Sequence, residues 1–411
     1  MKFGKKNVSL LIGLTILFRL IFLFATPNLS QDFYRFIWDG RLLFEGINPY
    51  LSLPETFIEQ RSFPIAEAQN LYEGMGNLNG SHYTNYPPLN QLCFLIAALF
   101  GSKSIFGSVI VLRLIIILAD IGILYFGKKI LEKMNISVHH IFWYLLNPFI
   151  IIELTGNLHF ESVMLFFLIW SFYQLQQKRW FFAGILLACS ISVKLIPLLF
   201  LPLFYQWFVK PKENQKKYLA FPNFSELKKL VAFYAIALGT TILLFLPFYS
   251  STLIDNYMNS VGLWFGKFEF NASFYYLFRE VGFWISGYNQ IAIIGKITPI
   301  LTILFLVYLT FFRKNKNLNQ LIAACLFGLS FYYFTTTTMH PWYLSTLILL
   351  SAFTKYRFPI IWSLVIMLSY SAYQNETYQE NLWLISLEYI IVYGFLIWEL
   401  CTKRKQPISL T

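Results

Sequence analysis

Two carboxylates stand close together in the stretch QDFYRFIWDGRLLFEGINPY, residues 31–50, which directly follows the first long apolar run of the chain. Asp32 and Asp39 are seven residues apart, so a helix would put them on roughly one face, two turns apart. Either carboxylate could act as a general base that takes a proton from an attacking hydroxyl, with the other orienting substrate. Arg35 lies three residues after Asp32, and an ordinary helical salt bridge is the competing interpretation.

Lys194 interrupts the apolar stretch ACSISVKLIPLLFLPLF, residues 188–204, in which it is the one charged residue. Its long stem could simply carry the ammonium group to the lipid headgroups, which would need no function. An ammonium group at the membrane boundary is also well suited to binding a phosphate. The functional interpretation of Lys194 is therefore a ligand for a lipid phosphate.

Further polar residues belong to the same side of the membrane in the topology described below. His340, in TTTTMHPWY, could donate to a phosphate or carry a proton, whereas Trp342 and Tyr343 fit an interfacial aromatic belt. His159, in GNLHFE, is either a substrate contact or a packing histidine. The other candidates for substrate contact are Tyr34, Arg41, Tyr86, Asn157 and Glu161. Polar groups at a membrane edge are costly, so their occurrence on one face suggests a single site.

The composition places these residues in a membrane protein. The chain of 411 residues is 57% hydrophobic and contains 44 Phe. Its apolar runs approach or reach the ~20 residues that a helix needs to cross hydrocarbon. They are continuous, whereas the strands of a membrane barrel would alternate apolar and polar residues. We predict an all-α polytopic protein in which residues 1–411 form a single integral membrane domain.

Twelve spans are predicted, with a range of 11 to 13, and an even number puts both termini on one side. They cover residues 8–26, 107–127, 139–155, 159–177, 179–193, 195–209, 230–248, 289–312, 318–336, 341–354, 358–373 and 382–401. The first run is longer than the apolar part of a signal peptide, and no small-x-small cleavage site follows it. We therefore interpret it as a retained span.

The basic residues gather on one predicted side. If sides alternate from Lys2, 22 of the 32 Lys and Arg residues fall inside, and 12 of the 20 acidic residues fall in outward loops. This is the positive-inside bias, so the net charge of +12 orients the chain and requires no nucleic acid. We expect both termini to be cytoplasmic and the site to face the opposite side of the membrane.

Two outward segments are large. Residues 27–106 contain turn signals, and they include a 13-residue apolar piece, residues 89–101, that is too short to cross. We predict that this piece is a re-entrant or interfacial helix, and that the whole segment carries the catalytic Asp. Residues 249–288 form the second outward loop. The four cysteines lie singly in apolar stretches without metal-ligand spacing, as buried hydrophobic residues do.

Five motifs occur in one order within residues 1–345. They are QDFYRFIWDGRLLFEGINPY, YTNYPPLNQ, NPFIIIELTGNLHFE, KRWFFAGILLACSISVKLIPLLFLPLF and HPWY. Together they resemble the GT-C superfamily of membrane glycosyltransferases, and they are similar to bacterial polyprenol-phosphate-mannose-dependent mannosyltransferases. The resemblance implies a GT-C fold and the transfer of a hexose, with mannose expected, from a polyprenyl-phosphate donor to a lipid or glycan acceptor. It also implies a catalytic Asp just after the first span, which matches Asp32 by position, while Asp39 occupies a second acidic position and stays open.

The resemblance further implies that basic residues at the membrane edge bind the donor phosphate, and Lys194, His340 and Arg35 are the candidates. Such a cluster would stabilise charge on the departing phosphate, and a single displacement would invert the anomeric centre. The outward loop lacks adjacent Asp-Asp or Asp-x-Asp, so we expect neither a metal nor another cofactor. The expected partners are the donor, the acceptor and membrane lipids. The resemblance to bacterial enzymes also implies the bacterial cytoplasmic (inner) membrane, with the site facing the periplasm or exterior.

Two other classes of function stay open. A flippase or transporter of lipid-linked glycans would also place polar groups at the membrane edge, but it predicts polar residues along several spans and two comparable halves. A glycan ligase or polymerase that uses a pyrophosphate-linked donor would be expected to carry more outward arginines than Arg35, Arg41, Arg61 and Arg279.

Overall fold

The computed structural model describes residues 5–209, 223–374 and 379–403. Its N-terminal half contains α1 (Lys5–Ile21), α2 (Asp32–Phe44), α3 (Pro54–Glu59), α4 (Ala68–Gly80), α5 (Pro88–Phe100), α6 (Ile105–Lys133), η1 (Val138–Ile141), α7 (Phe142–Leu145), α8 (Pro148–Ile150), η2 (Ile151–Gly156), α9 (Glu161–Gln176), α10 (Trp180–Ile191), η3 (Ile196–Phe204) and α11 (Tyr205–Phe208). Its C-terminal half contains α12 (Phe224–Phe245), η4 (Leu246–Phe248), α13 (Leu253–Gly266), α14 (Phe274–Ser286), α15 (Ile291–Phe311), α16 (Leu318–Thr335), η5 (Pro341–Tyr343), α17 (Leu344–Ala352), α18 (Phe358–Val365), η6 (Ile366–Gln374) and α19 (Leu382–Lys403).

The protein is an all-α polytopic membrane protein. Among the described residues, five helical segments are long and apolar enough to cross a membrane, namely α6, α12 with η4, α15, α16 and α19. A sixth crossing is formed if Pro148–Gly156 and Glu161–Gln176, which are bent by 112°, count as one span. Shorter apolar helices occupy six further stretches. Each of the twelve predicted ranges contains helix, whereas the number of crossings stays a prediction.

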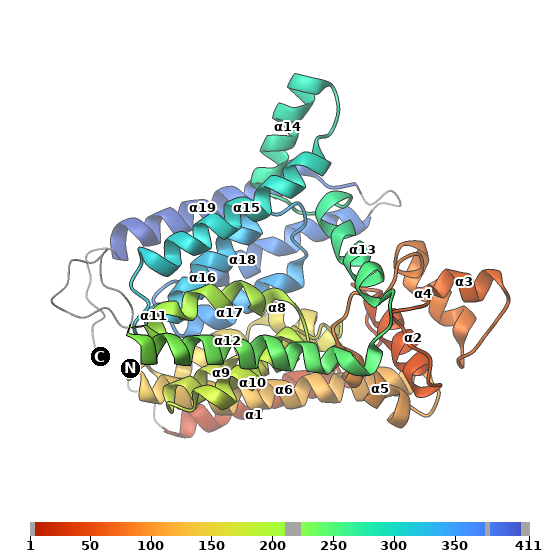
Figure 1. Ribbon diagram of the computed structural model, residues 1–411, viewed down its shortest axis with the longest axis horizontal. Helices are drawn as coiled ribbons and strands as arrows, with labels where there is room; N and C mark the ends of the chain where they lie inside the picture. Colours follow the sequence, from red (N-terminus) through yellow and green to blue (C-terminus); the bar gives the residue numbers. More distant parts are fainter. Residues whose placement is uncertain (1–4, 210–222, 375–378, 404–411) are drawn as a thin grey trace.

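The helices α2 to α5 lie at the end of the molecule opposite the start of α1 and the end of α19 (Figure 1). Residues 89–101, predicted as a short apolar helix, correspond to α5, whereas the outward position of this segment stays a prediction. Pro88 starts α5 in its first turn, where a missing N–H costs nothing. Gly40 lets α2 approach α5 closely, because a Cβ at this position would collide with the backbone of Phe94.

Buried charged residues in the helical bundle hold helices together. Arg19 near the end of α1 donates to the Asp120 carboxylate of α6 at 2.7 Å and to the Leu145 carbonyl at 2.7 Å, and both charged side chains are buried. Arg113 of α6 donates to the carbonyls of Thr155 and Gly156 at the end of the π-helix η2. These side chains have structural partners, so they do not form a polar path through the spans.

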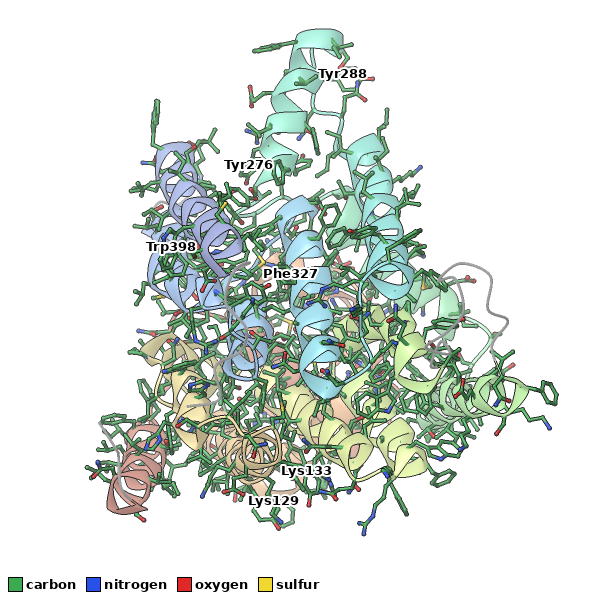
Figure 2. The ribbon with its side chains drawn as sticks, turned by 90° about the vertical axis from the view of Figure 1, so that its left-hand side faces the viewer. Lys129, Lys133, Tyr276, Tyr288, Phe327 and Trp398 are labelled. Carbon is green, nitrogen blue, oxygen red and sulfur yellow. The ribbon has the colours of Figure 1, made fainter. Side chains whose placement is uncertain are left out.

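The second predicted outward loop is largely helical. It contains α13 and α14, and α14 projects beyond the rest of the bundle (Figures 1 and 2). Figure 2 shows Tyr276 and Tyr288 of this projection at the top, while Lys129 and Lys133 of α6 lie at the bottom. Between α13 and α14, Phe270 forms an isolated parallel β-bridge with Thr338. The bridge attaches this segment to the chain just before His340.

Candidate active site

Asp32 is the first residue of α2 and is partly exposed. Asn79 Nδ2 donates to its Oδ1 at 3.4 Å. Burial raises the pKa of Asp32 above its ordinary value, the charge on Lys194 and the hydrogen bond from Asn79 oppose that shift, and the charge on Glu161 adds to it. A carboxylate with a raised pKa is a better proton acceptor near neutral pH.

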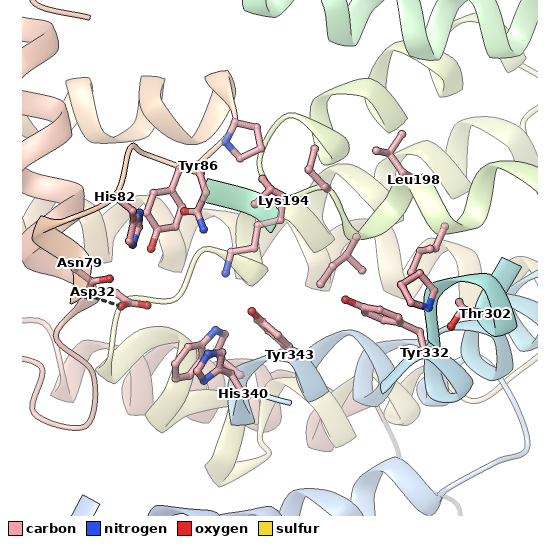
Figure 3. A pocket seen from close by; sticks show the side chains of 18 of the residues that line it. Asp32, Asn79, His82, Tyr86, Lys194, Leu198, Thr302, Tyr332, His340 and Tyr343 are labelled. Carbon is pink, nitrogen blue, oxygen red and sulfur yellow. Dashed lines mark hydrogen bonds between the residues drawn. The ribbon is translucent and has the colours of Figure 1, made fainter. Parts of the chain in front are cut away.

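Asp32 lines a cavity of about 420 Å³ whose other lining residues come from α4, the segment before α5, η3, α15 and α16, among other elements. In Figure 3, Asp32 and Asn79 lie at one end of this cavity and Tyr332 and Thr302 at the other, with Lys194 between them. The polar lining comes from Asp32, Asn79, His82, Asn85, Lys194 and His340. The apolar lining comes mainly from η3 and α15, with Leu195, Ile196, Leu198, Leu199, Pro299 and Ile303. The cavity therefore has one polar end and one largely apolar end.

Lys194 lies in the break between α10 and η3. Pro197, at the start of η3, cannot donate a backbone hydrogen bond and favours such a break. The carbonyl of Ser192 accepts hydrogen bonds from the N–H groups of Leu89 and Asn90 at the start of α5, which fixes this break against α5. The Lys194 ammonium forms a short ion pair with the buried Glu161 carboxylate, the first residue of α9. The ion pair with Glu161 therefore fixes the position of the Lys194 ammonium group, and Lys194 lines the cavity.

His340 is one layer of an aromatic stack. The His340 ring stacks on Trp342 at 4.6 Å between centroids, and the other face of Trp342 stacks on His159 at 3.9 Å. Phe270 covers the outer face of His340 at 5.4 Å. Burial and the charge on Lys194 lower the pKa of His340 to about 3, so its imidazole is neutral and can donate one N–H. His340, Trp342 and Tyr343 line the cavity, while His159 supports Trp342 from behind.

Asp39 and Arg35, predicted as a possible base and a phosphate ligand, lie outside the cavity lining. Arg35 Nε donates to Asp39 Oδ1 at 2.8 Å, and both side chains are buried. Arg35 also donates to the carbonyls of Asn79 and His82, and Gln91 donates to Asp39 at 3.0 Å. This network fixes the backbone at Asn79 and His82, whose side chains line the cavity. The two residues therefore position the site and do not reach into it.

Four other predicted contacts also lie outside the cavity lining. Arg41 pairs with Glu67 at 3.1 Å and anchors α2 to the start of α4, and the ring of Tyr34 packs against Gly74 of α4. Asn157 accepts a hydrogen bond from the N–H of Leu29 and so holds the segment after α1. Glu161 acts through its ion pair with Lys194. Tyr86, by contrast, lines the cavity, and its contact with substrate stays a prediction.

Comparison with known families gives these residues a common context. A sequence model described as the alpha-(1->6)-mannopyranosyltransferase N-terminal domain matches residues 4–210, half of the chain. The chain belongs to this alpha-(1->6)-mannopyranosyltransferase family. The match covers Asp32 and Lys194 and ends before His340. It confirms the resemblance to membrane mannosyltransferases.

A relative of this mannosyltransferase chain is "GPI mannosyltransferase 1" from Schizosaccharomyces pombe. The two are 25% identical over 222 residues, which is 53% of the present chain and 57% of the relative. The matched region thus spans little more than half the length of that curated relative.

Sequence reasoning missed several cavity residues of this mannosyltransferase-family chain. Asn79 lies at the end of α4, His82 and Asn85 come from the segment between α4 and α5, and Thr302 and Tyr332 come from α15 and α16. The density of polar and aromatic residues in HYTNYPP, directly before a short apolar helix, is the signal that could have indicated His82 and Asn85. Nothing in the apolar surroundings of Thr302 distinguishes it from a residue that bonds its own helix.

No group of three or more His, Cys, Asp or Glu side chains that could hold a metal ion occurs among the described residues. The cavity offers one carboxylate, Asp32, opposite an ammonium group. A single carboxylate beside a fixed positive charge is a poor donor set for a divalent cation. Metal-independent chemistry therefore stays the working prediction.

Proposed function

We propose that this protein is an inverting mannosyltransferase. It moves mannose from a polyprenyl-phosphate donor to a hydroxyl of a lipid or glycan acceptor at the outward face of the membrane. Family membership supports mannosyl transfer, and the two-ended cavity is the single observation that supports the lipid-linked donor. A carrier of this kind has an anionic sugar phosphate at one end and a long hydrocarbon chain at the other. The polar end of the cavity, with Lys194, matches the sugar phosphate, and the apolar end matches the hydrocarbon chain.

The donor lies with its phosphate near Lys194 and its hydrocarbon chain along η3, α15 and Tyr332. The apolar lining from Leu198, Leu199 and Ile303 suits such a chain, because burying apolar surface contributes roughly 25 cal/mol per Å². The Glu161 carboxylate is paired with Lys194 and compensates its charge, so the ammonium group is not an isolated charge in a buried site. The donor phosphate becomes a second anionic partner of the Lys194 ammonium group and accepts a hydrogen bond from the N–H of His340.

Asp32 is the general base. It accepts the proton of the acceptor hydroxyl as that oxygen bonds to the anomeric carbon of the sugar, while the bond from that carbon to the phosphate oxygen breaks. The electron pair leaves with polyprenyl phosphate, whose charge Lys194 and His340 stabilise. The proton stays on Asp32 until it passes to solvent. A single displacement on a β-linked donor gives an α-linked product.

Two neighbours of the reacting groups act as positioning residues. Asn79 donates to Asp32 and orients its carboxylate toward the cavity. Trp342 stacks on both His159 and His340, and this stack holds the plane of the His340 ring. A site that must hold a base and a leaving-group donor in fixed geometry benefits from such support.

The competing classes fit the described residues less well. A transporter needs polar groups along its spans, whereas Arg19, Asp120 and Arg113 are occupied in helix-to-helix contacts. A ligase with a pyrophosphate-linked donor has an additional phosphate to neutralise. The cavity lining contains a single side chain with a permanent positive charge, Lys194, among the described residues.

The test is mannose transfer from radiolabelled polyprenyl-phosphate mannose by membranes that contain the protein, with total lipid and glycan extract as acceptor and EDTA present. Asp32→Asn should lower the rate roughly 100- to 10,000-fold, the usual contribution of a general base. Asp255→Asn is the matched control, because Asp255 is exposed on α13 and should tolerate the change at full rate.

Each other outcome has a definite meaning. Equal rates for Asp32→Asn and wild type would refute the role of Asp32. Activity that disappears with EDTA and returns with a divalent cation would refute metal independence. Transfer from a pyrophosphate-linked glycan, with none from the monophosphate donor, would favour the ligase. Donor lipid that moves across the membrane without sugar transfer would favour the flippase.

A further inference from the structure

A second hollow lies between α13 and α15, on a different part of the same two helices that contribute to the cavity wall. Its volume is about 460 Å³. It is lined by Gly262 of α13 and Gly295 of α15, and the small size of glycine leaves the space open. Among the described residues, no atom other than the nearby backbone of α13 itself lies within 4 Å of the position that a Cβ on Gly262 would take. The hollow is therefore a surface depression that a ligand could fill without displacing side chains of α13.

Two lysines line this hollow from opposite helices. Lys267 directly follows α13, Lys296 lies in the second turn of α15, and both side chains are exposed. Within the described part of the chain neither forms an ion pair. Both belong to the outward side, where basic residues are sparse under the positive-inside bias. An unpaired lysine on a membrane-spanning helix is costly unless it reaches water or an anion.

The surroundings of the two lysines include exposed apolar side chains. Met258 of α13 and Ile293 and Ile297 of α15 are all about half exposed or more. Asn259, which also lines the hollow, adds a neutral side chain that can donate a hydrogen bond. A ligand with an anionic oxygen group could pair with the two lysines and Asn259, and a hydrocarbon chain next to that group could cover the apolar side chains.

We propose that this hollow binds the phosphodiester headgroup of an anionic phospholipid of the outer leaflet. Two ammonium groups match one phosphodiester because charge-assisted hydrogen bonds to phosphate are stronger than neutral ones. The acyl chains lie along Met258, Ile293 and Ile297. The bound lipid joins α13 to α15 and so steadies Val261 of α13 and Pro299 of α15, which line the cavity.

This lipid site is distinct from the donor site. It shares no lining residue with the cavity around Lys194. Its existence does not rest on mannosyl transfer, and its test needs no activity measurement.

The test is native mass spectrometry of the detergent-purified full chain with added phosphatidylglycerol, with phosphatidylcholine and inorganic phosphate as separate arms. The background is Lys194→Gln, so that anionic lipid in the main cavity does not obscure the result. Phosphatidylglycerol should bind this protein more tightly than phosphatidylcholine. Replacing both lysines, Lys267→Gln with Lys296→Gln, should weaken phosphatidylglycerol binding roughly tenfold or more, since each loses a hydrogen bond to a charged group.

Three variants separate charge, space and general damage. Lys267→Arg with Lys296→Arg keeps both charges and should keep binding. Gly262→Leu fills the hollow without changing charge and should also weaken binding. Gly13→Leu on α1, where a Cβ would likewise have no neighbour within 4 Å, is the matched control and should not.

The proposal is overturned if the double Gln variant binds phosphatidylglycerol as well as its parent, or if Gly262→Leu has no effect. It is also overturned if phosphatidylcholine binds equally well, because the charge would then play no part. If inorganic phosphate binds as well as phosphatidylglycerol and its binding also depends on the two lysines, the lysines bind a free anion and the lipid site is refuted.

Discussion

Asp32 and Asp39 share a helix and, by their spacing, a face, yet their surroundings differ. Seven residues along α2 separate them by about 10 Å. At the first position the helix begins beside the cavity, so the Asp32 carboxylate is partly exposed. At the second position the helix is packed against α5, and Asp39 is enclosed with Arg35 and Gln91. Position along the helix, and not the helical face, therefore decides which carboxylate can meet a substrate.

The raised pKa of Asp32 makes the transfer rate depend on pH. A general base must be ionised, so kcat/KM should fall as the pH drops through the pKa of Asp32, which burial places above the ordinary range for aspartate. Lys194 opposes this shift. Lys194→Gln should therefore move the acid limb of the residual activity to higher pH, and Lys194→Arg should leave it near the wild-type position.

A pH series of kcat/KM for these two variants checks this prediction. Lys314→Gln, which removes an exposed lysine outside the cavity lining, serves as the control and should keep the wild-type profile. An acid limb that stays in place in Lys194→Gln would mean that a group other than Asp32 titrates.

Part of the residue-level picture could be predicted from the sequence. Lys194 and His340 stand out because polar groups are rare in apolar surroundings, and both line the cavity. The sequence does not show whether Arg35 and Glu161 contact substrate or support the site. A charged residue beside a site has the same sequence pattern whether it binds substrate or pairs with another side chain. Only the ion pairs with Asp39 and Lys194 distinguish support from contact.

At the scale of helices, the contact between α2 and α5 positions the start of α2. Phe36 stacks on Phe94 at 4.7 Å, and Gly40 lies one turn further along against the Phe94 backbone. The spacing of small and aromatic residues in QDFYRFIWDG does not reveal this partner, because the contact joins two segments about 50 residues apart. The existence of the α5 helix was predictable from its apolar run, but its packing against α2 was not.

Gly40→Ala should destabilise the protein, because the added methyl group must push α5 away or bend α2. Overpacking of this kind costs roughly 1–3 kcal/mol. The transfer rate should fall as well, since Asp32 moves with its helix. Thermal unfolding in detergent measures the first effect, and the mannose assay measures the second.

Gly13→Ala is the comparison for this change, because a Cβ at Gly13 has no neighbour within 4 Å. Alanine is the better helix former by roughly 0.5–1 kcal/mol, so this variant should be neutral or slightly more stable. Equal melting temperatures for the two variants would show that the contact between Gly40 and Phe94 is not close in the protein.

For the molecule as a whole, charge and hydropathy predict the class and an orientation. The distribution of basic residues puts Lys314 inside and Ser62, in the segment between α3 and α4, outside. The number of crossings is harder to predict, because several helices are shorter than a bilayer and one pair bends by 112°. Apolar length alone does not separate a short span from a helix that enters and returns.

Labelling of introduced cysteines tests the orientation. In a chain with Cys401→Ser and Cys189→Ser, which removes the exposed and the half-buried native thiols and leaves the buried Cys93 and Cys325, Ser62→Cys should react with a membrane-impermeant maleimide in intact cells. Lys314→Cys should react only after the cells are permeabilised. The reverse pattern would invert the orientation and place the cavity with Asp32 on the cytoplasmic side.

The ion pair between Arg19 and Asp120 also has a consequence for how the chain is made. The two residues are 101 positions apart, so α1 is synthesised well before its partner in α6. At a translation rate of about 5–20 residues per second, Arg19 waits roughly 5–20 s for Asp120 to appear. An arginine without a counter-ion is unfavourable in hydrocarbon. The first helix is therefore expected to remain against the insertion machinery, or with Arg19 drawn toward the headgroups, until α6 arrives and the two enter lipid together.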